Sequence, residues 1–265
     1  MQAAGGSQAL LEFRAELLRD IYRGHYQLVD DNFDQFRFGY DGVDRSRQVD
    51  VDGHAAYLNF VLHNLESFFA ASLLFSDATS RALFSRLIRY RCLGHPHLRI
   101  WEDMTWTSVQ EMFNRAAQYE TGPSTSNFQG AFGPLKHFEG IPTNEAPVSL
   151  DVWRDNLAYC LGQGNHRHYF FERDGVRIQP EAGDCIIDGG ACFGDTGVFF
   201  ARAAGPQGRV YSFEPLPTHI DVIALNIDQN KLEDRMFIVP NGLGETTNQV
   251  QAIATRDDLV YVGGE

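Results

Sequence analysis

Apolar residues recur at helical spacing in three stretches of the first hundred residues. The stretch over residues 8–24 places four of them on one face, namely Leu10, Phe13, Leu17 and Ile21. A second stripe begins after His54. A third follows Ser76 or Asp77, either of which can cap a helix, and Gly94 would end it. Because residues three and four apart share one face of an α-helix, each stretch predicts an amphipathic helix that packs on other helices.

The composition changes after residue 120. Residues 121–147 are rich in Gly, Pro, Ser, Thr and Asn, which indicates a connecting stretch with one short strand, and a further strand is expected at 169–171. We therefore expect three parts: a helical N-terminal region over 1–120 that serves as a cap or in oligomerisation, a connecting segment over 121–165, and an α/β part over 166–265.

From residue 183 onward, short apolar runs alternate with amphipathic helices. Strands are predicted at 185–187, 210–213 and 236–239, with one helix that opens at Asp195 and a second that Thr218 caps. Strands that alternate with helices over short turns are typical of a doubly wound parallel sheet, which defines an α/β fold of Rossmann-like topology. In such a sheet the ligand site lies outside the carboxyl ends of the strands.

Two features meet at that edge of the predicted sheet. Asp188 ends the first strand, and the glycines that follow would let the backbone turn tightly and approach a ligand, namely Gly189, Gly190 and Gly194. Glu214 ends the second strand, where a carboxylate can accept hydrogen bonds from both hydroxyls of a ribose. The pattern therefore predicts a cofactor that contains adenosine.

The turn differs from that of a dinucleotide-binding protein. Such a turn usually reads GxGxxG, whereas this one reads Asp188-x-Gly190-x-x-x-Gly194, with Cys192 in place of the middle glycine. Asp195 at the start of the helix would repel a pyrophosphate and suits an ammonium group, such as the amino-acid end of S-adenosylmethionine. This favours a methyltransferase over two alternatives, a nicotinamide-dependent oxidoreductase or sugar-nucleotide enzyme, and a non-catalytic Rossmann-like binding module.

Three motifs together resemble the FkbM family of small-molecule O-methyltransferases. They are residues 183–196, Val210-Tyr-Ser-Phe-Glu214-Pro215 and Asn226-x-x-x-Asn230, within a resemblance that covers the chain from about residue 73 to the end. It implies a class I methyltransferase fold, S-adenosyl-L-methionine as cofactor, and methyl transfer to a hydroxyl of a sugar, polyketide or other metabolite. It also implies a set of cofactor-binding residues: Asp188, Gly189, Gly190, Ala191, Gly194, Asp195, Thr196, Glu214, Pro215 and Asn241.

The resemblance also implies a role for some of these residues. Asp188, Gly190 and Gly194 would line the methionine end of the cofactor. Glu214 would hold its ribose, and Asn241 or Gly242 would lie near the adenine. No general base is assigned, because in this fold the groups that face the substrate come from later strands. The chain stops after three predicted parallel strands, which would leave the first with an unpaired edge, so we expect a C-terminally truncated fragment.

The charge balance argues against nucleic acid as a partner. The chain has 22 Lys and Arg against 35 Asp and Glu, a net charge of −13 that repels phosphates. Two histidine pairs, His95-x-His97 and His166-x-His168, lack the further ligands that a metal site needs, so no metal is expected. The 4 cysteines form no CxxC pair, and no signal peptide or bilayer-spanning run is visible. We expect a soluble cytoplasmic protein whose oligomeric state the sequence leaves open.

Overall fold

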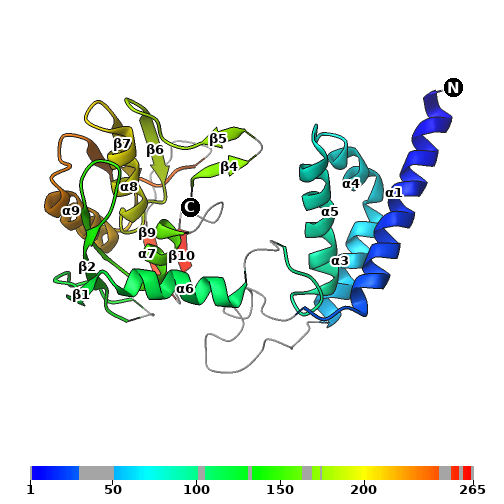
Figure 1. The fold of residues 1–265 in the computed structure, drawn as a ribbon, viewed down its shortest axis with the longest axis horizontal. Coiled ribbons are helices and arrows are strands. Elements are labelled where there is room, and N and C mark those ends of the chain that lie inside the picture. The colour runs from blue at the N-terminus through cyan, green and yellow to red at the C-terminus, as the bar shows by residue number, and fades with distance from the viewer. Residues whose placement is uncertain are drawn as a thin grey trace. The chain divides into compact units, whose positions relative to one another are not determined.

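A computed structural model describes residues 2–29, 51–100, 105–130, 133–162, 169–173, 175–244, 252–256 and 259–263. The chain divides into two compact units, Met1–Gln110 and Glu111–Glu265 (Figure 1). The described elements of the first unit are helical, and every described strand belongs to the second.

Four helices lie wholly within the described part of the first unit. They are α1 (Gln2–His25), α3 (Val51–His63), α4 (Leu65–Ser72) and α5 (Ala78–Leu93). The carboxylate of Asp77 caps α5 as predicted, because it accepts a 2.7 Å hydrogen bond from the Ser80 N–H, and Gly94 ends the helix. The apolar stripes meet in one core, which contains Leu17, Ile21, Val61, Ile88, Cys92 and Leu93. The helical spacing of the sequence is thus confirmed.

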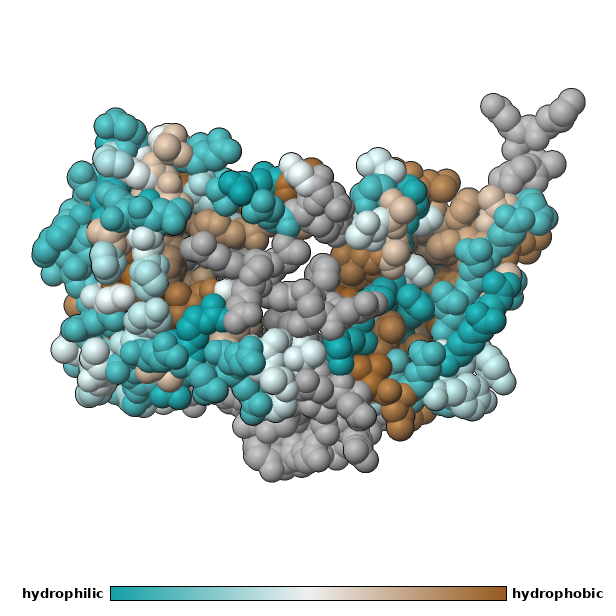
Figure 2. Space-filling model, viewed as in Figure 1, coloured by the Kyte–Doolittle hydropathy of each residue, from teal (hydrophilic) through white to brown (hydrophobic). Residues whose placement is uncertain are grey.

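The helical unit also carries apolar side chains on its surface. Figure 2 shows hydrophobic residues on the outside of this unit, and the exposed ones include Leu11, Phe60, Leu73 and Leu74. Exposed apolar side chains of this kind are ordinary at protein surfaces. Among the described helices, none combines the length and the apolar character needed to cross a membrane.

The second unit opens with an antiparallel sheet. After α6 (Trp106–Ala117), three strands lie in the order β1-β2-β3, over Glu120–Pro123, Lys136–Ile141 and Val148–Val152, and α7 (Arg154–Leu161) follows. The segment expected as a connection over 121–165 therefore contains a sheet and a helix. Its strands are short and interrupted by irregular register, which hides the alternation of buried side chains such as Phe138, Ile141, Val148 and Leu150.

A parallel sheet carries the alternation of strands and helices. Its strands β6 (Cys185–Gly189), β7 (Arg209–Phe213) and β8 (Met236–Val239) lie in the order β6-β7-β8, joined by α8 (Asp195–Ala204) and α9 (Pro217–Asn230) (Figure 1). This confirms the predicted α/β, Rossmann-like fold. The predicted cap of the second helix is wrong: Leu216 rather than Thr218 precedes α9, because Pro217 takes the first helical position, which suits its fixed φ.

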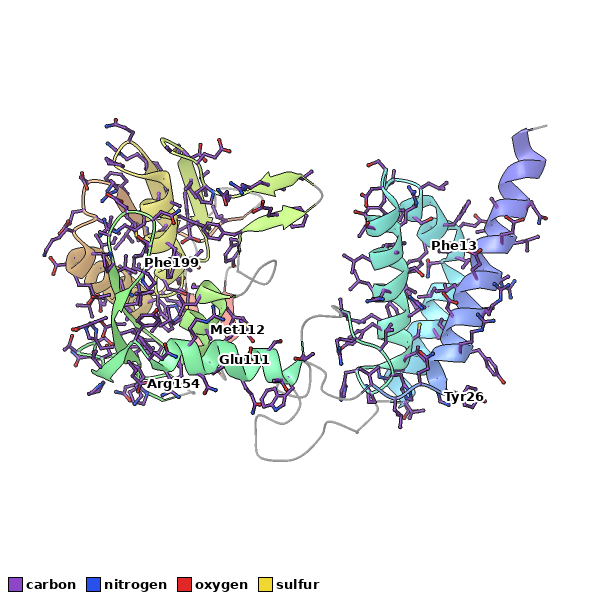
Figure 3. All side chains as sticks on the ribbon, viewed as in Figure 1. Phe13, Tyr26, Glu111, Met112, Arg154 and Phe199 are labelled. Atoms are coloured by element: carbon purple, nitrogen blue, oxygen red, sulfur yellow. The ribbon has the colours of Figure 1, made fainter. Side chains whose placement is uncertain are left out.

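One face of the parallel sheet is covered by helices, and the other is exposed. On the face toward α8 and α9, the core includes Phe193, Val198, Phe199, Val222, Ile223 and Met236, together with Met112 of α6 (Phe199 and Met112 are labelled in Figure 3). On the other face Ile187 is 67 % exposed, and the rings of Tyr211 and Phe237 stack at 5.4 Å. Among the described strands, β6 pairs with β7 alone. β8 likewise pairs with β7 alone, so the described residues leave both edges and one face of this sheet open.

Two short hairpins complete the second unit. They are β4 (Phe171–Arg173) with β5 (Val176–Ile178), and β9 (Ala252–Arg256) with β10 (Leu259–Gly263). The strand expected at 169–171 begins only at Phe171. Tyr169 has a φ of +60°, which no strand residue adopts, and therefore lies in the preceding turn.

Candidate functional site

The turn between β6 and α8 is open to solvent at its first glycine. Gly190 has a φ of +77°, and a Cβ placed on it would meet no atom within 4 Å. The N–H groups of Gly190 and Ala191 both donate to the Phe213 carbonyl at 3.0 Å, which ties the turn to the end of β7. Cys192 follows with a φ of +51°, an unusual value for a residue other than glycine. A ligand can therefore approach the backbone of this turn at Gly190.

Gly194 has a different task in the same turn. It caps α8 in the left-handed conformation, with a φ of +74°, and a Cβ there would lie 3.0 Å from Ile223 Cγ2 and 3.1 Å from Met236 Cε. Both contacts are closer than ordinary van der Waals distance. The glycine is therefore required by backbone conformation and by packing at once.

Gly194→Ala is expected to lower the free energy of unfolding by about 2–3 kcal/mol, because it adds steric crowding to the conformational cost. Gly183→Ala is the matched control, since Gly183 has a φ of +88° but open space around its Cα. The control should lose only about 1 kcal/mol. Urea unfolding of both variants measures the difference, and equal losses would contradict the packing role of Gly194.

The carboxylate of Glu214 is fixed against this turn. Its Oε2 accepts a 2.9 Å hydrogen bond from the Cys192 N–H, and its Oε1 accepts one of 3.0 Å from the Leu216 N–H. The ring nitrogen Nδ1 of His219 lies 3.6 Å from Oε1. Burial of Glu214 raises its pKa, but interactions with His219 and the two N–H groups outweigh burial, so the pKa lies below its usual value. Glu214 is therefore ionised, and each oxygen retains acceptor capacity for a ligand.

Two further carboxylates border the turn. Burial, followed by the charges of Asp195 and Glu214, raises the pKa of Asp188 from 3.8 to about 6. Its Oδ2 is buried without a hydrogen-bond partner among the described residues, as is the hydroxyl oxygen of Ser212. Burial also raises the pKa of Asp195, although the Cys160 thiol donates to its Oδ2 at 3.4 Å. Burial thus makes the charged forms of both aspartates unfavourable, and a cation in the site would offset this effect.

Positive charge is what this arrangement can attract. Three acidic side chains influence one another around the start of α8, and the pKa of Asp188 is raised by two of them. The N-terminus of a helix alone would favour an anion. Here the carboxylates oppose that preference, so a pyrophosphate is disfavoured, whereas a ligand with an ammonium or sulfonium group is favoured.

Asp188→Asn is expected to stabilise the protein at pH 7 by about 1–3 kcal/mol, because it removes a carboxylate that the fold holds in an unfavourable environment. Since the pKa is raised on folding, from 3.8 to about 6, the native state of the natural protein holds the proton more tightly than the unfolded state. Stability therefore falls as the pH rises through this window, and the variant should lack this loss. Urea unfolding at pH 4 and pH 7 tests it; parallel pH profiles would contradict the assignment.

The predicted site residues fall into two groups in the structure. Most of them form the turn itself or face it from the end of β7, namely Asp188, Gly189, Gly190, Ala191, Gly194, Asp195, Thr196, Glu214 and Pro215. Asn241 lies after β8, where its N–H donates to the Val239 carbonyl at 2.7 Å and its side chain is exposed. The residue that reaches the turn from this loop is Leu243, whose Cδ1 lies 2.7 Å from a Cβ placed on Gly189. Their roles toward a cofactor stay predictions.

Sequence reasoning did not assign a role to Asn226, which is fully buried in α9. Its Nδ2 donates to the carbonyls of Phe193, at 2.8 Å, and Asp151, at 3.2 Å, while its Oδ1 accepts from the Asp151 N–H at 2.8 Å. Asn230 bonds Ser149 of β3 in the same manner. The two side-chain amides thus pair with the backbone of β3 as a further strand would. The bond from Asn226 to Phe193 also holds the turn between β6 and α8 to this strand. A polar pair one helical turn apart, Asn226 and Asn230, was the available signal.

The histidine pairs lie apart from this site in the sequence. In the described part of the chain, no three His, Cys, Asp or Glu side chains are grouped so that they could hold a metal ion. His97 Nδ1 contacts the Gln27 carbonyl at 2.9 Å, within the helical unit. His166-x-His168 lies outside the described residues. The expectation of a metal-free protein stays a prediction.

The sequence is similar to a methyltransferase over a limited length. No protein-family model matches the chain. Over 81 residues the chain is 30% identical to a catechol O-methyltransferase from Mycobacterium tuberculosis (strain ATCC 25618 / H37Rv), which covers 30% of this chain and 36% of that protein. The chain therefore spans about a third of the length of this curated relative. The match supports the broad class predicted from the motifs, a methyltransferase, and does not single out the FkbM family.

Two solved structures are similar over part of the chain. Cofactor-bound Rv0187 from MTB is 34% identical and covers 21% of this chain and 25% of that chain, with a TM-score of 0.20. Fibrillarin from Aeropyrum pernix, in complex with natively bound S-adenosyl-L-methionine, is 14% identical and covers 46% and 55%, with a TM-score of 0.22. At these TM-scores neither likeness carries an argument about fold or function.

Proposed function

We propose that the chain binds S-adenosylmethionine at the turn between β6 and α8 and belongs to a methyltransferase that acts on a hydroxyl oxygen of a small molecule. The observation that carries the proposal is the ionised Glu214 carboxylate, bonded at 2.9 Å to the N–H of Cys192 in the open, acidic turn. The acidic residues and the partial similarity to a methyltransferase both support it. The acceptor expected from the FkbM resemblance, a sugar, polyketide or other metabolite, belongs to the same proposal.

Each part of the turn has a task in this proposal. Gly190 has no side chain and lets the ligand lie close to the backbone of the turn. Asp188 and Asp195 attract the ammonium and sulfonium charges of the ligand. Glu214 accepts hydrogen bonds from the ribose hydroxyls with the acceptor positions that the backbone leaves open. Asn241 and Leu243 belong to the loop after β8, beside which the adenine would lie. Asn241 would be its polar neighbour and Leu243 its apolar one.

When bound, S-adenosylmethionine supplies an electrophilic methyl group on a cationic sulfur. The chain would hold this methyl in line with the acceptor oxygen and shield it from water, so that the O–C bond forms as the C–S bond breaks. The hydroxyl proton must pass to a base, and none of the described residues is assigned to that step.

Calorimetric titration tests the proposal directly. The chain is expected to bind S-adenosylhomocysteine saturably and NAD not at all, because the three carboxylates oppose a pyrophosphate. Saturable binding of NAD alone would indicate an oxidoreductase instead. Binding of neither ligand by the folded chain would support the non-catalytic module and would end the proposal.

A further inference from the structure

Tyr169 has a backbone conformation that a bulky residue seldom adopts. Its φ is +60°, and among the described residues only Cys192 and Lys231 share a positive φ without being glycine. Such a conformation costs about 1 kcal/mol or more and persists where the surrounding structure imposes it. The surrounding structure therefore imposes this backbone conformation at Tyr169.

The ring of Tyr169 is held beside α8 and remains largely exposed. Its centroid lies 5.9 Å from that of Phe200, in an edge-to-face contact, and Phe170 packs on the same ring at 6.2 Å. Phe200 is buried in α8, whereas Tyr169 is 67 % exposed. Phe200 thus supports the tyrosine from one side, and a large part of the aromatic surface is available to a ligand.

The ring packs on α8, the helix that begins at Asp195, and acidic residues of the turn act on its hydroxyl. After partial burial, the charges of Asp188 and Asp195 are the main causes that raise the pKa of the Tyr169 hydroxyl. Both aspartates belong to the turn, Asp188 at the end of β6 and Asp195 at the start of α8. An exposed aromatic ring therefore lies within the electric field of two acidic side chains, Asp188 and Asp195.

An aromatic face and carboxylates together recognise a weakly hydrated cation. The negative face of the ring attracts a sulfonium or ammonium group, and the carboxylates add to the attraction. A neutral thioether of the same shape lacks this interaction. The arrangement therefore has the chemistry to distinguish a cationic ligand from its neutral counterpart.

We propose that the ring of Tyr169 covers the cationic end of the bound cofactor and lets the site bind S-adenosylmethionine in preference to S-adenosylhomocysteine. This inference rests on the proposed function, since it presumes that the turn holds the cofactor. It adds a binding residue from the chain preceding β4, outside the motifs of the turn. S-adenosylhomocysteine, which has lost the methyl group and the sulfonium charge, would then leave more readily.

Titration of both ligands into the natural protein and three variants tests the proposal. Tyr169→Asn removes the ring and tolerates a positive φ, so a loss of affinity reports on the ring and not on strain. It should bind S-adenosylmethionine about 3- to 30-fold more weakly, with less than about a 2-fold change for S-adenosylhomocysteine. Tyr169→Phe keeps the ring face and should bind both ligands as the natural protein does. Tyr22→Asn, at an equally exposed tyrosine of α1, is the control and should change neither.

The outcomes separate the two proposals. If the natural protein binds both ligands and Tyr169→Asn weakens them equally, or weakens neither, the role of Tyr169 is overturned while the cofactor site stands. If the natural protein binds neither, the proposed function fails and this inference fails with it. Circular dichroism checks that each variant is folded, and Tyr169→Gly, which also accepts a positive φ, repeats the test if the asparagine variant is not.

Discussion

Glu214→Ala is expected to weaken binding of S-adenosylhomocysteine by about 10- to 150-fold, the value of two hydrogen bonds to a charged acceptor. The same change should lower the free energy of unfolding by about 2–4 kcal/mol. Stability is expected to fall because Glu214 accepts hydrogen bonds from two backbone groups at once. The N–H groups of Cys192 and Leu216 donate to its two oxygens, and both would be left without an acceptor in a buried place.

Two further variants separate the two effects of Glu214. Glu214→Gln keeps the shape and one acceptor oxygen but removes the charge, so it should retain more stability than the alanine variant while affinity still falls. Glu233→Ala, at an exposed glutamate after α9, should change neither quantity. Titration calorimetry and urea unfolding give both numbers. A folded Glu214→Ala protein that binds S-adenosylhomocysteine as tightly as the natural one would remove Glu214 from the site.

Asn226→Ala should have the largest effect on stability, a loss of about 3–5 kcal/mol. Its side chain bonds the backbone of Asp151 in both directions and the carbonyl of Phe193, so the truncation leaves several buried groups unpaired. It also leaves a cavity in the core, where Asn226 is fully buried. Because Phe193 belongs to the turn, loss of this bond should also loosen the candidate site.

Urea unfolding measures the expected loss at Asn226. Asn144→Ala, at an exposed asparagine of the same unit, should cost less than about 0.5 kcal/mol. Asn226→Asp keeps the acceptor for the Asp151 N–H but brings a charge toward two carbonyl oxygens, so it should not restore stability. A loss below about 1 kcal/mol for Asn226→Ala would show that β3 and the turn do not depend on this amide.

The parallel sheet could be predicted because its signals are local. The apolar strand at 185–187, the glycines after it and the helix from Asp195 stand in one short stretch, and β8 has the predicted bounds of 236–239. The family resemblance also implied the open edge of β6, because the chain stops after three predicted parallel strands and leaves the first without a second neighbour. These features depend on neighbours in the sequence, so periodicity and turn residues suffice.

The antiparallel sheet could not be predicted in this way. Its strands are held by pairing between segments that the sequence separates with Gly, Pro and Thr, and by the amides of Asn226 and Asn230, more than 70 residues away. The buried face of α9 shows the same limit. The apolar Ala224 is exposed, whereas the polar Asn226 is buried because its amide pairs with backbone.

The candidate site was predicted in its residues and not in its contacts. Asp188, the glycines and Glu214 follow from strand ends, but the bond from the Cys192 N–H to Glu214 depends on the path of the turn. A strand was expected from residue 169, and the structure instead places Tyr169 in a turn with a positive φ. Backbone conformation of this kind has no signature in the residue type, because tyrosine normally avoids it.

Hydrogen exchange with and without saturating S-adenosylhomocysteine tests most directly whether this turn is the cofactor site. The ligand should slow exchange of the N–H groups at 189–196 and of Glu214 and Leu216, which line the turn, more than in the rest of the second unit. Binding without protection of these segments, or protection centred on another part of the chain, would contradict the site.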